Sequence, residues 1–543
     1  MKRRLWRAVL MVHLLGYIAF AQDRTVGVFN VAPGISEGYT LFSPSANNKA
    51  YLIDNCGQLV NSWEASAKPG NALYLMDDGS LYRAAKVQNM QIVAGGAGGI
   101  IEKYNWEGDL TWSYKYSTPN VRAHHDFQVL PNGNVLILAW EVKSRINCIQ
   151  NGRNPELLSE NELWPEKIIE VEPVGADGGT IVWEWNAWDH MVQDFDDSKG
   201  NFGVVADHPE KINVNYIRPG VDGADWQHAN SIDYNAQLDQ IMLSVLFFDE
   251  IWIIDHSTST AEAAGPKGDL LFRWGNPKAY NNGGVEDQQL FGQHNAHWIA
   301  PGLPEAGKVM VFNNGVNRPD GVYSSVIKLD LNTSGDYPKD DLNRFLPNTY
   351  FWEHTASPKT NFYSRFISGA HQLPNGNTLI TDGAHGTFFE INSDQEEVWR
   401  YVSPVTIFGI ADQGNIVTNP AGDGTNTVFR ATKYPANHPA FLGRDLTPGP
   451  PIENNPDLSP CEIELSTPHH NRSPSKIAMF PNPASDYVTI VNYQGAYSIV
   501  NVQGKTVING TLTESGPIPT YTLVSGLYFV RFDNGTLKKL IIQ

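Results

Sequence analysis

Residues 129–138 read VLPNGNVLIL, and residues 372–381 read QLPNGNTLIT. A weaker copy, LMDDGSLY, stands at residues 75–82. Pro-Asn-Gly between two apolar runs is a hairpin signal, because such turns need the positive φ that Gly and Asn adopt readily. Each copy therefore predicts two antiparallel β-strands joined by a tight turn.

A second pattern accompanies these hairpins: an apolar strand, a polar or Gly-containing turn, and a strand that contains Trp. It occurs at residues 168–185 (IIEVEPVGADGGTIVWEW) and 268–274 (GDLLFRW). The turn glycines Gly79 and Gly133 are roughly 50 residues apart, which is the length of a four-stranded propeller blade. Gly376 follows Gly133 after about five such lengths, so the spacing predicts about six blades.

These patterns predict an all-β fold. We expect a six-bladed β-propeller over residues 25–460, followed by a small C-terminal β-sandwich at residues 476–543. A single sheet cannot bury both of its faces, and stacking the sheets around an axis covers them. A pair of β-sandwiches is the alternative, and the recurring phrases favour the propeller.

The composition excludes several classes of protein. Of 543 residues, 39 are Lys or Arg and 58 are Asp or Glu, which gives a formal net charge of −19. Nucleic-acid binding needs clustered basic residues, so we expect no nucleic-acid partner. Hydrophobic residues make up 41%, which supports a core and excludes global disorder. Cys56, Cys148 and Cys461 are far apart in the sequence, so zinc spacing and CxxC redox motifs are absent.

The first residues have the pattern of an export signal. Lys2, Arg3, Arg4 and Arg7 precede an apolar run at residues 8–21 that ends in Ala-Phe-Ala. Residues 1–21 are therefore predicted to be a secretory signal peptide. A membrane anchor is the alternative, but about 14 apolar residues fall short of the roughly 20 that span a bilayer. We expect no transmembrane segment in the mature chain.

The last residues form a separate compositional region after a polar, Pro-containing break at residues 473–475. Residues 479–487 (MFPNPASDY), 526–530 (GLYFV) and 537–542 (LKKLII) resemble the C-terminal sorting domain of the type IX secretion system of Bacteroidetes. The resemblance implies a partner, the type IX secretion machinery. It also implies export through the periplasm to a secreted or cell-surface location. An ordinary accessory β-domain is the alternative.

Four of the 15 histidines stand in similar surroundings. They are His125 in RAHHDF, His228 in DWQHANS, His294 in GQHNAHW and His371 in SGAHQ. The innermost strand of each blade lines the central channel, so equivalent positions on several blades converge on one axis. A single His is usually structural, whereas four at matching positions indicate a functional cluster.

Two kinds of chemistry suit such a cluster. Neutral imidazole is a common metal ligand, but no compact ligand spacing is present, and we expect no metal and no cofactor. The other is nucleophilic or acid–base chemistry on an anionic substrate. Arg122, Arg273, Arg318 and Arg365 lie near the histidines in sequence. Convergent Arg and His suit a charged tetrahedral ester such as sulfate or phosphate.

Several stretches resemble the bacterial arylsulfate sulfotransferase family over most of residues 95–450. They are residues 225–231 (DWQHANS), 268–277 (GDLLFRWGNP), 367–377 (ISGAHQLPNGN) and 429–434 (FRATKY). The resemblance implies a six-bladed propeller that moves a sulfuryl group from an aryl sulfate to a phenol, without a nucleotide donor. A channel His becomes a sulfohistidine between the two steps of this ping-pong scheme.

The resemblance also implies roles for individual residues. By order and spacing, His371 matches the nucleophile, and His228 and His294 match the flanking channel histidines. Arg318 matches the sulfate-binding Arg, and Thr432 the late-chain Thr of the family.

The family's pattern is not followed at one position of this proposed site. The family places an Asn two residues after the His that His294 matches, and this chain has Ala296 there. Asn295 or His297 is expected to compensate. Together with His125, these two complete the expected substrate-binding set.

Two other functions remain open at this point. One is a non-catalytic secreted propeller that binds polysaccharide or protein, suggested by 15 Trp and 22 Tyr residues. The other is a quinoprotein dehydrogenase, whose propellers are also rich in Trp. Its regular tryptophan-docking repeats are not evident in the sequence.

Overall fold

The computed structural model describes residues 24–331, 335–419, 422–461, 477–491, 493–502, 504–513, 515–533 and 536–543. The predicted signal peptide at residues 1–21 lies outside these ranges. The chain divides into two compact units, residues 1–462 and residues 463–543. Strands make up 43% and helices 8% of the structure, which confirms the all-β prediction.

The described part of the larger unit contains six antiparallel sheets of four or five strands, besides three short two-stranded sheets. From the innermost strand outward, the first three are β5 (Pro69–Leu75), β6 (Leu81–Lys86), β7 (Gly99–Tyr104), β8 (Leu110–Lys115); β9 (Val121–Val129), β10 (Val135–Glu141), β13 (Glu166–Val174), β14 (Gly178–Asn186); and β17 (Ala229–Asn235), β18 (Gln240–Val245), β19 (Glu250–Asp255), β20 (Phe272–Trp274). The fourth is β21 (His294–Trp298), β22 (Val309–Asn313), β23 (Ser325–Leu329), β24 (Trp352–His354).

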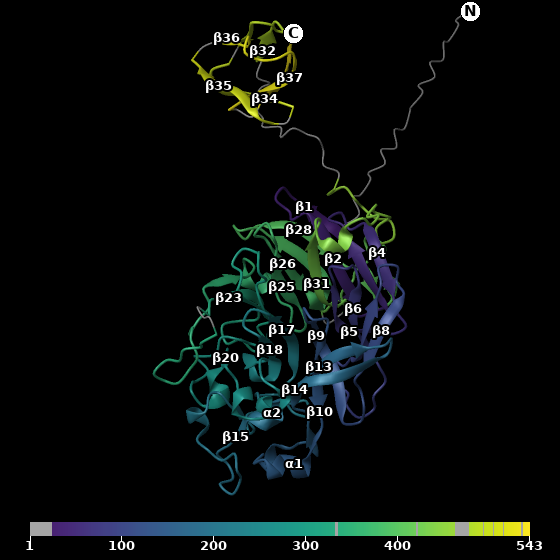
Figure 1. Ribbon diagram of the computed structural model, residues 1–543, viewed down its shortest axis with the longest axis vertical. Helices are drawn as coiled ribbons and strands as arrows, with labels where there is room; N and C mark the ends of the chain where they lie inside the picture. Colours follow the sequence, from purple (N-terminus) through teal and green to yellow (C-terminus); the bar gives the residue numbers. More distant parts are fainter. Residues whose placement is uncertain are drawn as a thin grey trace, which may run out of the picture. The chain divides into compact units, whose positions relative to one another are not determined.

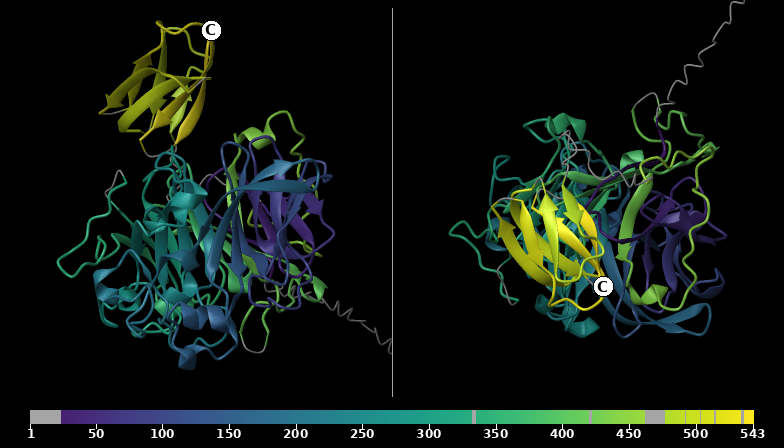
Figure 2. Two further views of the ribbon diagram at one scale, coloured as in Figure 1. Left: turned by 60° about the horizontal axis from the view of Figure 1, so that its bottom comes forward. Right: turned by 90° about the horizontal axis from the view of Figure 1, so that it is seen from above.

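The last two sheets combine strands from both ends of the unit. They are β25 (Gly369–Gln372), β26 (Thr378–Asp382), β27 (Thr387–Ile391), β28 (Glu397–Val402), β1 (Gly27–Val31); and β31 (Val428–Pro435), β2 (Gly38–Pro44), β3 (Lys49–Ile53), β4 (Leu59–Glu64). In Figure 1, β2 in purple lies beside β31 in green, and Figure 2 shows this meeting of early and late strands from two more sides. The inner strands contact one another in the order β5, β9, β17, β21, β25, β31 and back to β5, so the ring is closed.

The recurring Pro-Asn-Gly phrases lie where the sequence predicted hairpins. They connect β9 to β10 and β25 to β26, and the weaker copy connects β5 to β6. Gly133 and Gly376 have φ values of 88° and 91°, which explains why Gly occupies these turns. The phrase therefore marks the connection from the innermost strand to the second strand in three sheets.

The Trp-containing strands have a shared function at the outer edges of the sheets. Five Trp side chains, which we call the tryptophan belt, donate from Nε1 to a backbone carbonyl of the next sheet at 2.6–2.9 Å: Trp63 to Asn105, Trp112 to Gly178, Trp185 to Gly268, Trp274 to Pro347 and Trp399 to Asn55. At the sixth junction, the Nδ1 atom of His354 lies 3.0 Å from Oε1 of Gln395. The belt links neighbouring sheets and buries the indole rings between them.

A disulfide joins Cys56 to Cys461 across 405 residues. Cys56 lies in the turn between β3 and β4, and Cys461 ends the described part of the larger unit. The bond thus fastens the last described residues of this unit to the sheet that contains β3 and β4.

Short elements lie between the main strands. They include α1 (Arg145–Gln150), α2 (Thr260–Ala263), and the strand pairs β11 (Lys143–Ser144) with β12 (Glu162–Leu163) and β15 (Met191–Val192) with β16 (Ile212–Asn213).

The smaller unit consists of two antiparallel sheets around one core. Its strands are β32 (Ala478–Phe480), β33 (Tyr487–Val491), β36 (Gly516–Pro519), and β34 (Gly495–Asn501), β35 (Thr506–Leu512), β37 (Gly526–Phe532), β38 (Leu537–Ile542). Ile490, Ile499 and Val530 are buried between the sheets. This agrees with the predicted β-sandwich.

Candidate functional site

Three inner strands, β9, β17 and β21, have a distorted backbone within the strand or just before it. His125, His228 and Asn295 have φ values of 47°, 53° and 52°, in the left-handed region that non-glycine residues rarely adopt. The pairing register shifts at the same places in β9, β17 and β21. A β-bulge re-aims a side chain at a cost of about 1–3 kcal/mol, and such strain concentrates at functional sites.

A cavity of about 430 Å³ lies where all six inner strands begin. Each inner strand, or the residues just before it, contributes to the lining: Asn71, His125, His228, His294, Ile367 and Thr427. Leu246, Phe247, Val316 and Phe366 add an apolar wall. The cavity therefore combines three imidazoles with a surface that suits an aromatic ring.

His294 has a defined protonation pattern. Asn314 donates from Nδ2 to the carbonyls of Ser364 and Ile367 at 2.8 and 2.9 Å, so its Oδ1 atom must face His294 as an acceptor. Nδ1 of His294 lies 2.8 Å from that oxygen and donates to it. Burial lowers the pKa of His294 to about 3, so the ring is neutral. The lone pair of the ring is therefore on Nε2.

The surroundings of His228 favour the opposite charge state, a protonated ring. Its Nδ1 lies 2.5 Å from Oδ2 of Asp225. Burial lowers the pKa of His228, but the charge and the hydrogen bond of Asp225 outweigh burial, so the pKa is raised above its ordinary value. Phe247 packs on the ring at a centroid distance of 4.7 Å. The carboxylate of Asp225 therefore holds the ring in place and favours its protonated, imidazolium form.

His125 is the third imidazole of the lining, and its ring centroid is 4.6 Å from that of His228. Burial and the neighbouring His228 lower its pKa well below the ordinary value, so it is neutral. Gly96 packs against the face of its ring, where a Cβ atom would stand only 1.9 Å from Nε2 and 2.0 Å from Cε1. Position 96 has φ 75°, so it requires Gly for its backbone as well as for space.

Arg218 is the cation that sequence analysis missed. It lies in the cavity lining and donates from Nε to Oδ2 of Asp249 at 2.8 Å. The second carboxylate oxygen of Asp249 accepts the Gly292 N–H at 2.6 Å, which fixes the ion pair beside His294. Arg365 also reaches the lining, but it is exposed and paired with Asp423.

The other predicted site residues lie outside the lining of this cavity. His371, on β25, accepts the Lys433 N–H on Nε2 at 3.0 Å, and burial lowers its pKa to about 3. Arg318 pairs with Glu353 at 3.6 Å and packs on Tyr323. Its guanidinium is thus used within its own sheet.

His297, Asn295 and Thr432 complete this set. Nδ1 of His297 lies 3.1 Å from the carbonyl of Asn295, and Oδ1 of Asn295 accepts the Ala370 N–H at 3.1 Å. Thr432 is half-buried on β31, opposite Leu41 of β2. The structure therefore brings His125, His228 and His294 together in one cavity lining, which does not include the remaining predicted residues.

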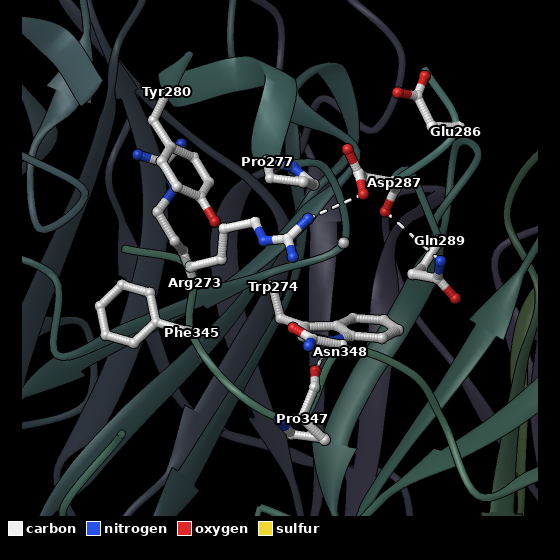
Figure 3. A pocket seen from close by; sticks show the side chains of 12 residues that line it. Arg273, Trp274, Pro277, Tyr280, Glu286, Asp287, Gln289, Phe345, Pro347 and Asn348 are labelled. Atoms are coloured by element: carbon white, nitrogen blue, oxygen red, sulfur yellow. Dashed lines mark hydrogen bonds and ion pairs between the residues drawn. The ribbon is translucent and has the colours of Figure 1, made fainter. Parts of the chain in front are cut away.

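A second pocket, of about 130 Å³, lies around Arg273, Tyr280 and Phe345 (Figure 3). Both arginines of the lining are already paired: Arg344 with Asp287 at 2.8 Å, and Arg273 with the buried Glu250. This pocket is small and contains no His, so the histidine-lined cavity is the better candidate site. No group of three or more His, Cys, Asp or Glu arranged to hold a metal ion occurs within the described ranges.

A closed ring of antiparallel sheets, with a ligand-sized cavity where its inner strands begin, defines a β-propeller with a central site. The chain belongs to the arylsulfotransferase (ASST) family, whose family model matches residues 28–407. Residues 478–543 match the secretion system C-terminal sorting domain. This type IX sorting domain directs the chain to the cell surface or to secretion, which confirms the predicted location. No helix within the described ranges is long and apolar enough to cross a membrane.

Solved structures with a similar shape are distant in sequence. A protein of unknown function from Bacteroides caccae is 12% identical, with a TM-score of 0.40 over 73% of this chain and 99% of that one. The periplasmic gluconolactonase PpgL of Pseudomonas aeruginosa is 9% identical, with a TM-score of 0.35 over 93% and 99%. An inactive virginiamycin B lyase of Staphylococcus aureus is 10% identical, with a TM-score of 0.31 over 70% and 89%. Such likenesses carry no information about function, and the comparison with curated proteins gave no match.

Proposed function

We propose that this chain transfers a sulfuryl group from an aryl sulfate to a phenol, with His294 as the nucleophile. The observation that carries the proposal is the fixed tautomer of His294. Its Nδ1 donates to Asn314, and its Nε2 holds the lone pair of a neutral ring in the cavity lining. A neutral imidazole nitrogen with a free lone pair is a competent nucleophile near neutral pH.

The hydrogen bonding of His371 disfavours this residue, which the resemblance to the family suggested as the nucleophile. Its Nε2 lone pair already accepts the Lys433 N–H. Attack from that atom would first break this hydrogen bond, and the ring is not part of the cavity lining. We therefore propose a nucleophile on β21, in the sheet that precedes the sheet of β25 along the chain.

The first step breaks one bond and forms another. The Nε2 lone pair of His294 attacks sulfur, and the sulfur–oxygen bond to the aryl group breaks with its electrons leaving on the phenolate oxygen. Phenols have a pKa of about 10, like Tyr, so the phenolate takes up a proton from the enzyme. A second phenol then gives a proton to the enzyme and attacks the sulfohistidine, which restores His294.

The negative sulfuryl oxygens need fixed positive charge. Arg218 and His228 supply it, and carboxylates hold both in place before substrate binds, Asp249 for the first and Asp225 for the second. Preorganised charge stabilises a transferring group more than charge that must move during the reaction. Phe247, Val316 and Phe366 give the aryl ring an apolar surface.

The test uses a chromogenic aryl sulfate with a phenol acceptor. We expect the wild type to release the chromophore and to form the sulfated acceptor. His294→Ala should abolish both, and mass spectrometry of the wild type without acceptor should find the sulfuryl group on His294. Absence of turnover by the wild type would overturn the proposal, and binding of the aryl sulfate without turnover would favour a non-catalytic binding propeller.

A further inference from the structure

Behind His125 a line of hydrogen bonds leads away from the cavity into the protein. Nδ1 of His125 lies 2.9 Å from Nδ1 of His124. Nε2 of His124 lies 2.9 Å from Oε2 of Glu166 on β13. His124 is 3% exposed and Glu166 is 1% exposed. A carboxyl group is thus connected to the cavity surface through two imidazole rings and has no access to solvent.

The line is held rigidly. The ring of Trp140 stacks on His124 at a centroid distance of 3.8 Å and an interplanar angle of 11°. Oε1 of Glu166 accepts the Ala229 N–H at 2.7 Å, and the Glu166 N–H donates to Oε1 of Gln227 at 2.7 Å. Because its other oxygen is occupied, Glu166 presents only Oε2 to His124.

Two arrangements of the protons satisfy these hydrogen bonds, and in both arrangements His124 and His125 are neutral. With a protonated Glu166, each group donates toward the cavity, and His125 presents an Nε2–H. With an ionised Glu166, each bond reverses, and His125 presents an Nε2 lone pair. The two arrangements differ by one proton, which is present at Glu166 in the first and missing in the second.

We propose that Glu166, His124 and His125 form a proton relay, in which Glu166 stores the proton that the leaving phenolate takes and the accepting phenol returns. This inference rests on the proposed sulfuryl transfer. When the phenolate leaves, it takes the Nε2 proton of His125. His125 takes the Nδ1 proton of His124, and His124 takes the carboxyl proton of Glu166. The second half-reaction runs the three transfers in reverse, so protons balance over one turnover.

The pKa shifts of these groups favour the arrangement in which Glu166 is protonated. Burial raises the pKa of Glu166 well above its ordinary value and lowers the pKa of His124 and His125 well below theirs. The charged groups that act on the line are Asp225, His228 and Arg122, with His294 and Arg430 acting on His125. His124 and Glu166 are positioning residues in this scheme, since neither lines the cavity.

The decisive variant is Glu166→Gln. The amide has the shape of the carboxyl group, can still accept from Ala229 and can donate to His124, but it cannot release a proton. Turnover of phenyl sulfate should fall about 100-fold, because general acid catalysis is lost. Turnover of a nitrophenyl sulfate should change far less, since its phenolate is a much weaker base and needs little protonation. A merely structural defect would lower both rates equally, and that result would overturn the relay.

The matched control is Glu170→Gln, on the same strand. Glu170 also pairs with a His, through Oε2 at 3.0 Å from Nε2 of His256, but neither residue lines the cavity. This variant should leave the dependence on the leaving group unchanged. An equal change in both Gln variants would contradict the relay.

Infrared difference spectra separate this inference from the proposed function. At neutral pH the wild type minus Glu166→Gln should show the carbonyl stretch of a protonated carboxyl group. Its absence would overturn the relay even if the enzyme turns over aryl sulfates. If the wild type shows this carbonyl stretch but does not turn over aryl sulfates, the result would support the protonated Glu166 and overturn only the proposed sulfuryl transfer.

Discussion

The outer strands and the inner strands of the ring use repetition in different ways. On the outside, the tryptophan belt repeats one interaction at five of six junctions, with the same donor atom and a backbone acceptor each time. On the inside, three histidines occupy similar positions, but each has its own partner: His124 for His125, Asp225 for His228 and Asn314 for His294. The outside repeats a contact, whereas the inside repeats a position and varies the charge state.

The difference has a physical cause. The belt joins neighbouring sheets, so every junction poses the same problem and accepts the same solution. The cavity needs a nucleophile, a fixed cation and a proton donor at one place, and these functions require different pKa values. Changes at the belt should therefore alter stability, and changes at the cavity should alter activity.

The largest effect is expected at the nucleophile. His294→Ala should lower kcat by roughly 1,000-fold or more, because the covalent step loses its attacking atom. His371→Ala should leave clearly more activity than His294→Ala. The two variants are compared in steady-state kinetics, with thermal unfolding as the check on folding. Equal losses, or a larger loss at His371, would contradict the choice of nucleophile.

The disulfide should act on stability alone. Reducing the bond, or replacing both Cys56 and Cys461 by Ser, should lower the free energy of unfolding by about 2–5 kcal/mol, since the unfolded chain regains freedom. The measurement is denaturant unfolding with and without reductant. Below the unfolding transition kcat should not change, because the bond does not reach the cavity, and a parallel fall in kcat would count against the separation of the two regions.

A smaller effect on activity is expected from Asp225→Asn. Losing the carboxylate lowers the raised pKa of His228, so the loss of activity with rising pH should begin at a lower pH. The ion pair stabilises the fold below the ordinary pKa of His, and this contribution disappears as the pH rises through the raised value. A pH–rate profile of kcat/KM should show the shift together with a loss of about 100-fold at neutral pH. An unchanged profile would mean that His228 does not act as a cation.

The smallest effect is expected at the belt. Trp185→Phe removes the hydrogen bond to Gly268 and leaves most of the ring in place, so it should destabilise the fold by about 1–3 kcal/mol. Calorimetry would measure this change, and kinetics at low temperature should match the wild type. His354→Phe, at the one junction without a belt Trp, provides the matched comparison. If Trp185→Phe lost activity but not stability, the belt would not be a purely structural region, and this would contradict the contrast between belt and cavity.

The sequence predicts the repeated features well because they are local. The turns of residues 129–138 and 372–381 lie where expected, since Asn and Gly settle the turn within a few residues. Of the four histidines whose similar surroundings predicted convergence, His125, His228 and His294 line one cavity, whereas His371 is not part of its lining.

The partners of these histidines were beyond sequence reasoning. Asn314 is 20 positions from His294 and Glu166 is 42 from His124, and neither stands in a recognisable motif. Arg218 lies in the stretch between β16 and β17, where no periodic pattern places a side chain. One signal was available: His228 and Asp225 are three residues apart in DWQHANS, a spacing at which an acid can reach an imidazole.

The pairing of β31 with β2 also sets an order of events during synthesis and export. Strand β2 is made early, and its partner at residues 428–435 is made only after all of residues 45–427. Until that partner emerges, β2 has an open edge with unpaired backbone groups, which invites pairing with other chains. A chain that ends before β31 would keep this unpaired edge of β2. A chain truncated just before β31 should therefore aggregate as readily through this edge as one truncated halfway.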